Sequence, residues 1–95
     1  MRIRWTSPAL RDLSEIQDYV AQDSPAAAHR LADEIVSRSR DALTSNPFLG
    51  RPGQIAGTRE FVLTGTAYLL VYRVLQEDVE VLTLVHAARD WPKHV

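Results

Sequence analysis

The residues best suited to chemistry lie together near the end of the chain. The segment 85–91, Val-His-Ala-Ala-Arg-Asp-Trp, brings an imidazole, a guanidinium, a carboxylate and an indole close together. His86 could transfer a proton, Arg89 could bind a phosphate, and Trp91 could stack on a base or fill a partner's pocket. Alternatively, the segment is structural: Arg89 and Asp90 pair with neighbours and Trp91 covers the end of a sheet. The sequence leaves both interpretations open.

Three other side chains extend this hypothesis, because they lie in strands predicted to adjoin that segment. Arg59, Tyr68 and Arg73 could converge with the arginine of the terminal segment on the open face of a sheet. Arg73 interrupts an otherwise apolar strand. A salt bridge with Glu60 or Glu80 across the sheet would explain it without any functional role.

Metal and nucleophile chemistry find little support in the sequence. Cysteine is absent, and His29, His86 and His94 show no paired ligand spacing. There is no serine elbow motif, and the glycine-containing segment 50–53 lacks the lysine and the following helix of a phosphate-binding loop. We therefore expect neither a metal nor a cofactor.

Composition indicates one globular domain over residues 1–95, with 45% hydrophobic and 24% charged residues. Ten of the eleven basic residues are arginine, yet the net charge is −1, so any phosphate contact would have to be local. There is no run of eighteen apolar residues and no secretory-type N-terminal stretch. We expect a cytoplasmic protein with no membrane contact.

Two Ser-Pro pairs, at residues 7–8 and 24–25, each combine a good N-cap with a proline suited to the first helical position. Apolar residues at three- and four-residue steps then predict amphipathic helices over 8–22 and 25–45. The Asn-Pro pair at 46–47 ends the second helix. Because few residues join them, the helices should form an antiparallel hairpin, whose alanine-rich groove could also dock a partner helix.

The remaining segments predict strands over residues 2–5, 59–63, 67–75 and 79–85, with an ordered loop over 48–53. The last three strands follow one another through tight turns and should pair antiparallel. Packing the hairpin on one sheet face buries the apolar side of both layers. The expected fold is α+β and two-layer: a helical hairpin on a four-stranded, mainly antiparallel sheet.

Four groups of short motifs occur in order along the chain: Trp-Thr-Ser-Pro-Ala-Leu-Arg-Asp-Leu at 5–13, Arg-Glu at 59–60, Gly-Thr-Ala-Tyr and Val-Tyr-Arg-Val within 65–74, and Val-His-Ala-Ala-Arg-Asp at 85–90. Together with the order of elements, they resemble the RelE/ParE superfamily of bacterial toxins, the toxin halves of type II toxin–antitoxin modules. The resemblance spans essentially the whole chain.

The resemblance implies one of two activities. RelE-like members cleave messenger RNA on the ribosome, using basic residues of the open sheet face and the tail, whereas ParE-like members poison DNA gyrase. Arg89 matches a tail arginine of the nuclease type. However, Tyr68 is followed by Leu69 where nucleases often carry arginine, and residues 48–66 contain no lysine. These departures favour the ParE-like, plasmid-stabilisation branch.

A gyrase inhibitor would use the open sheet face and the tail to bind its target, through Arg59, Tyr68, Arg73, His86, Arg89 and Trp91. In the nuclease alternative, catalysis would fall on His86, Arg89, Arg73 and Arg59. A third hypothesis is a module member that has lost toxicity and serves only as a binding partner.

The resemblance also implies a cognate antitoxin that holds the toxin inactive in a heteromeric complex. Such antitoxins typically lay a helix along the helical hairpin and add a strand to the sheet edge. On this chain, the predicted antitoxin contacts are Leu10, Leu13, Leu31 and Ile35. Operator DNA would be bound only through the antitoxin's own DNA-binding domain.

Overall fold

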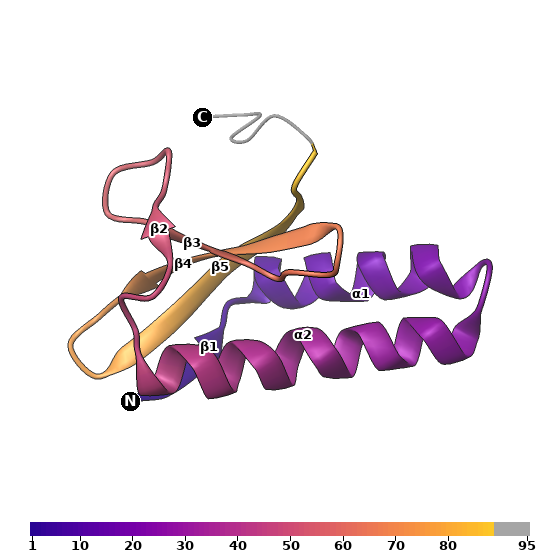
Figure 1. Ribbon diagram of the computed structural model, residues 1–95, viewed down its shortest axis with the longest axis horizontal. Helices are drawn as coiled ribbons and strands as arrows, with labels where there is room; N and C mark the ends of the chain where they lie inside the picture. Colours follow the sequence, from indigo (N-terminus) through magenta and orange to yellow (C-terminus); the bar gives the residue numbers. More distant parts are fainter. Residues whose placement is uncertain (89–95) are drawn as a thin grey trace.

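Two helices and five strands form the part of the chain that the computed structural model describes, residues 1–88. In order they are β1 (Arg2–Trp5), α1 (Ser7–Ala21), α2 (Pro25–Ser45), β2 (Arg51–Pro52), β3 (Arg59–Val62), β4 (Tyr68–Val74) and β5 (Asp78–His86). The helices lie side by side along one face of the sheet, and β2 and the loop after it project away from them (Figure 1). The expected two-layer α+β arrangement is confirmed.

The sheet has the order β1-β5-β4-β3-β2, so the last strand lies between the first and the fourth. β1 pairs with β5 in parallel, and the other neighbouring strands pair antiparallel. The expected count of four strands is corrected to five, because the loop expected over 48–53 contains β2. Pro52 is tolerated there, since a proline on an edge strand can turn its missing N–H toward solvent.

Both helices begin at a side-chain cap. Ser24 accepts a hydrogen bond from the N–H of Ala27 and caps α2, as the Ser-Pro signal predicts. The cap of α1 is Thr6, whose Oγ1 accepts from the N–H of Ala9 at 3.3 Å and donates to the carbonyl of Val81 at 2.8 Å. The second bond ties the helix start to β5, so α1 begins one residue earlier than expected. Neither helix within residues 1–88 is both long and apolar enough to cross a bilayer.

The core lies between the helices and the sheet, and its fully buried members include Ile35, Leu43, Leu70, Tyr72 and Val81. Because strand side chains alternate in direction, the neighbours of Leu70 and Tyr72 on β4 point to the opposite side. We call that side, away from the helices, the outer face. On β4 and β5 it carries Leu69, Val71, Arg73 and Glu80.

Candidate functional site

His86, at the end of β5, lies beside Tyr68 at the start of β4. The two are register partners, and their rings meet edge to face with centroids 5.6 Å apart and an interplanar angle of 79°. Nδ1 of His86 accepts a hydrogen bond from the N–H of Ala88 at 3.2 Å. A neutral imidazole in this arrangement carries its proton on Nε2, where it can be donated to a ligand.

This aromatic pair marks the end of the sheet from which the chain continues to Arg89 and Trp91. Both of those predicted site residues lie outside the described residues. Tyr68 also packs against the buried core cluster, and it is half-buried. Tyr68 and His86 are therefore together, at one end of the sheet and on its helix-facing side.

Arg73 lies near the other end of β4, on the outer face. Its Nε is 2.6 Å from Oε1 of Glu80, so one of the two predicted salt bridges for this arginine is confirmed. Arg4 of β1 contacts the other oxygen of the same carboxylate at 2.7 Å. The hydrogen bond from Arg73, supported by Arg4, holds the pKa of Glu80 below its ordinary value.

Arg59, on β3, contacts the segment that follows α2, away from both Arg73 and the Tyr68–His86 pair. Its Nη1 donates to the carbonyls of Gly50 at 2.8 Å and Phe48 at 3.3 Å, and its guanidinium lies 5.0 Å from the centroid of the Phe48 ring. Arg59 is the register partner of Tyr72, which places it on the helix-facing side of the sheet. The expected convergence of Arg59, Tyr68 and Arg73 on one open face is therefore wrong.

Tyr72 anchors the segment that Arg59 contacts. Its hydroxyl donates to the carbonyl of Pro47 at 2.7 Å and accepts from the N–H of Gly50 at 2.9 Å. Burial raises the pKa of this phenol, although the Gly50 hydrogen bond acts in the opposite direction. A Cβ at Gly50 would lie 2.7 Å from the Tyr72 hydroxyl and 2.8 Å from the carbonyl oxygen of Glu60, so no side chain fits there.

The four residues predicted to contact an antitoxin differ in exposure. Leu10 on α1 is 52% exposed, and Leu13 and Leu31 are half-buried against the core. Ile35 has no exposed surface, because its position on α2 faces the centre of the core. Ile35 is therefore corrected from a contact residue to a core residue, whereas the other three have surface to offer a partner.

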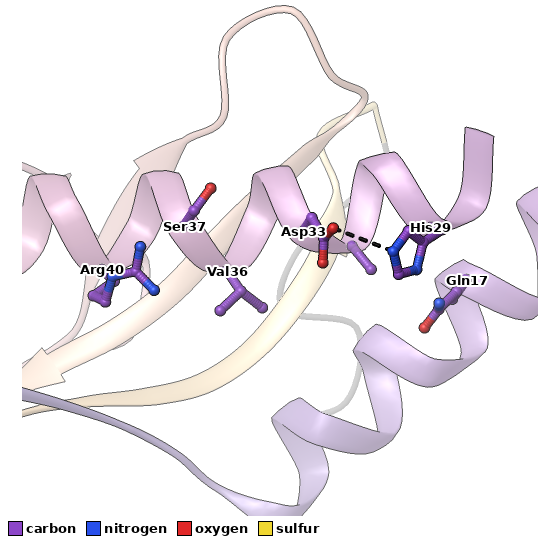
Figure 2. Close-up of a pocket in the computed structure, with 7 residues that line it drawn as sticks. Gln17, His29, Asp33, Val36, Ser37 and Arg40 are labelled. Atoms are coloured by element: carbon purple, nitrogen blue, oxygen red, sulfur yellow. Dashed lines mark ion pairs between the residues drawn. The ribbon is translucent and has the colours of Figure 1, made fainter. Parts of the chain in front are cut away.

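An open groove lies between the two helices of the hairpin. Figure 2 shows Gln17 of α1 opposite His29, Asp33, Val36 and Arg40 of α2. The ion pair between Nε2 of His29 and Asp33 spans 3.4 Å, and both side chains are exposed. The side chains that line the groove are mostly polar, with Ala32 and Val36 as its apolar members.

Sequence reasoning missed two sets of contacts. Asp12 of α1 accepts hydrogen bonds from the hydroxyl of Thr83 and the N–H of Leu84. It thereby gives a hydrogen-bond partner to a backbone N–H of β5 that lies beyond the end of the pairing with β1. Arg2 and Arg4 of β1 pair with Asp78 and Glu80 of β5. The second set had a signal in the sequence, since charged and apolar residues alternate in both strands.

Potential metal ligands do not cluster in the described part of the chain. Over residues 1–88, no three His, Cys, Asp or Glu side chains are grouped so that they could hold an ion. The chemistry available there is hydrogen bonding and ion pairing by arginines, carboxylates, hydroxyl groups and the imidazoles of His29 and His86.

Comparison with known proteins identifies the family. A family model described as ParE toxin of type II toxin-antitoxin system, parDE, matches residues 3–91. The protein Y4kP of Sinorhizobium fredii, named as a candidate toxin, is 48% identical over 92 residues, which cover 97% of this chain and 94% of that protein. Toxin RelE2 of Caulobacter vibrioides is 38% identical over 88 residues, covering 93% of this chain and 97% of that protein.

Solved structures give the same result. The chromosomal ParDE toxin–antitoxin system from P. aeruginosa contains a chain that matches with a TM-score of 0.80 and 28% identity, over 90% of this chain and 95% of that one. The RelBE2 toxin–antitoxin complex from Mycobacterium tuberculosis matches with a TM-score of 0.67 and 26% identity, over 93% of this chain and 92% of its own. The chain therefore belongs to the ParE toxin family of the RelE/ParE superfamily, and it is a toxin of a type II toxin–antitoxin system.

Proposed function

We propose that this toxin acts by binding DNA gyrase and stalling it with its DNA cut. The tail and the end of the sheet that carries Tyr68 and His86 would form the contact surface. The match of residues 3–91 to the ParE toxin family supports this target class. The proposal also agrees with the positions of Arg59 and Arg73, which lie on opposite sides of the sheet.

The observation that carries the proposal is how Arg59 and Arg73 are bound. Arg59 donates to the carbonyls of Gly50 and Phe48, while Arg73 pairs with Glu80 on the opposite side of the sheet. Cleavage of RNA needs a base, an acid and cations around one phosphorus atom. These two arginines cannot surround a common phosphate without leaving their partners, whereas an inhibitor that acts by binding does not need them to converge.

A supercoiling assay with purified gyrase tests the proposal directly. The expected result is inhibited supercoiling together with accumulated cleaved DNA as the toxin concentration rises. His86→Ala should weaken inhibition, and the matched control is His29→Ala, which removes an exposed imidazole on α2. Normal supercoiling at saturating toxin would reject gyrase as the target.

A ribosome-dependent messenger RNA endoribonuclease of RelE type is the second candidate. The Tyr68–His86 pair favours it, because a half-buried phenol beside an imidazole could move protons at a phosphate. The similarity to toxin RelE2 and to the RelBE2 structure points the same way. A translation extract treated with the same preparation should then contain cut messages, and Arg89→Ala or His86→Ala should abolish cutting. Intact messages would remove this candidate.

We further propose that a cognate antitoxin covers the helical hairpin, since the two similar solved structures are toxin–antitoxin systems. Leu10, Leu13 and Leu31 offer apolar surface on the hairpin, and β1 and β2 are the outermost strands of the sheet. Leu10→Asp should reduce co-purification with a co-expressed antitoxin. Leu75→Asp, on the β4–β5 turn and 37% exposed, is the control. Equal co-purification of both variants would contradict this docking surface.

A further inference from the structure

Three arginines form a row across the outer face where β1, β5 and β4 adjoin. Nε of Arg2 is 3.1 Å from Asp78, and Arg4 contacts Asp78 at 3.2 Å and Glu80 at 2.7 Å. Nε of Arg73 completes the row from β4, at 2.6 Å from Glu80. We call Arg2, Arg4 and Arg73 the arginine row.

The positive groups of the arginine row stand outward, and the carboxylates lie beneath them. The side chains of Arg2, Arg4 and Arg73 are 77%, 52% and 50% exposed, whereas those of Asp78 and Glu80 are 16% and 10% exposed. Three guanidiniums over two carboxylates leave a surplus of one positive charge. A partner approaching this part of the outer face therefore meets arginine side chains first.

The row also has hydrogen-bond donors to spare. A guanidinium has five N–H groups, and within residues 1–88 Arg2 and Arg73 each use only Nε, while Arg4 uses Nε and Nη2. The carboxylates fix the orientation of each guanidinium, so the outward N–H groups are arranged before any ligand arrives. Prearranged guanidiniums of this kind bind phosphate oxygens in pairs.

Fold stability alone does not account for the row. The arginines of these pairs are at least half exposed, which limits what each pair adds to stability, and two arginines would already neutralise the two carboxylates. The third arginine adds charge without adding a buried partner. Two apolar residues farther along the outer face, Leu69 and Val71, are buried, so the row is a prominent exposed part of that face.

We propose that the arginine row binds the phosphodiester backbone of a nucleic acid. Arg2 and Arg4 are two residues apart on one strand, about 7 Å, and Arg73 lies two strands from Arg4, about 10 Å. A row of separated guanidiniums on adjacent strands suits the repeating charges of an extended polyanion. Phosphate contacts position a protein without reading sequence. The choice of DNA as the nucleic acid rests on the proposed gyrase function, but the phosphate contact itself does not.

Fluorescence anisotropy tests this proposal with the full chain, carrying no N-terminal tag, titrated into a labelled DNA duplex or a single-stranded RNA. Arg2→Gln is the main variant, because Asp78 keeps its contact with Arg4 and the fold is spared. Binding should weaken roughly three- to tenfold at low salt, and the slope of log K against log salt should fall in magnitude by about 1 from about 3. Arg30→Gln, exposed on α2, removes the same charge and should leave both values unchanged.

Arg73→Lys provides a second variant, since it keeps the charge but loses the planar fork. It should weaken binding less than Arg2→Gln does, because the positive charge is kept, and circular dichroism should show that both variants are folded. Equal losses for Arg2→Gln and Arg30→Gln would overturn the proposal, as would absence of binding at low salt. Competition by polyglutamate as effective as that by DNA would also overturn it, in favour of an acidic protein partner.

The same proteins in the supercoiling assay separate this proposal from the proposed function. If gyrase is inhibited but nucleic acid is not bound, the arginine row fails and the gyrase target stands. If nucleic acid is bound through Arg2 while gyrase is unaffected, the row stands and the gyrase target fails. Stronger binding to RNA than to DNA would support the phosphate contact and would assign it to the ribosome-dependent alternative.

Discussion

Replacing Tyr72 by phenylalanine isolates the hydroxyl that anchors the segment after α2. The ring stays in the core, so no cavity forms, and only the hydroxyl is lost. Two backbone groups lose their partner: the N–H of Gly50, which is buried, and the carbonyl of Pro47. The effect of Tyr72→Phe should therefore come from hydrogen bonding alone.

The magnitude follows from those two contacts. A buried polar group left without a partner costs about 1–3 kcal/mol, and Pro47, which is half-buried, can recover part of its loss from water. Tyr72→Phe should therefore reduce the free energy of unfolding by about 2–4 kcal/mol. A chain of this size is stable by roughly 5–15 kcal/mol, so the variant should fold but with a clearly smaller margin.

Urea unfolding measures this loss, with an expected fall in the midpoint of about 1–3 M. Tyr19→Phe is the matched control, because Tyr19 is 69% exposed on α1 and should change the midpoint little. Hydrogen exchange at the Gly50 amide should accelerate in Tyr72→Phe. A midpoint within error of the wild type would refute the reasoning, because the hydroxyl would then contribute nothing to the anchor.

The same variant has a pH signature. Burial raises the pKa of Tyr72 above its ordinary value of 10.0, so the folded state holds the phenol proton more tightly than the unfolded state does. This contribution is complete below pH 10 and is lost as the pH rises through the higher folded-state pKa. The stability difference between wild type and Tyr72→Phe should therefore shrink above pH 10.

Three further outcomes are expected. Ser39→Ala should raise the free energy of unfolding by about 0.5–2 kcal/mol in urea, because Ser39 Oγ is buried without a hydrogen-bond partner in the described residues and alanine favours a helix. Thr6→Ala should lower it by about 1–2 kcal/mol and Ser7→Ala by less than about 0.5 kcal/mol; equal losses would contradict the cap assignment. Arg73 and Arg4 hold the pKa of Glu80 below its ordinary 4.5, so wild-type stability should decline as the pH falls through that lower value. Thermal melts from pH 6 to pH 3 should show a smaller decline for Glu80→Gln.

Much of the fold could be predicted from local signals. The second helix has the predicted bounds 25–45, because a Ser-Pro pair and an Asn-Pro pair delimit it. The start of α1 could not be placed as well, since Thr6 and Ser7 are both good caps and the choice depends on a hydrogen bond to Val81. The strand β2 has only two residues, which is too short for any periodic pattern, and it exists because β3 pairs with it.

The site was less predictable, because residue type does not determine which side of a sheet a side chain takes. A shift of one residue in register moves a side chain to the other face. Arg59 is the partner of Tyr72 and Arg73 is the partner of Glu80, so the two arginines lie on opposite sides. The alternating charges of the two strands hint at the pairing of Arg4 with Glu80. Predicting that pairing, however, requires knowing that the first and last strands are neighbours.

The position of β5 between β1 and β4 also determines when the nascent chain can complete its sheet. Because β5 is inserted between β1 and β4, the sheet cannot be assembled during synthesis until the segment Asp78–His86 has emerged from the ribosome. Chains that stop before it lack the strand that joins β1 to β4, and they lack the backbone groups that hold the start of α1. The complete five-stranded sheet of this toxin fold therefore depends on this late segment of the chain.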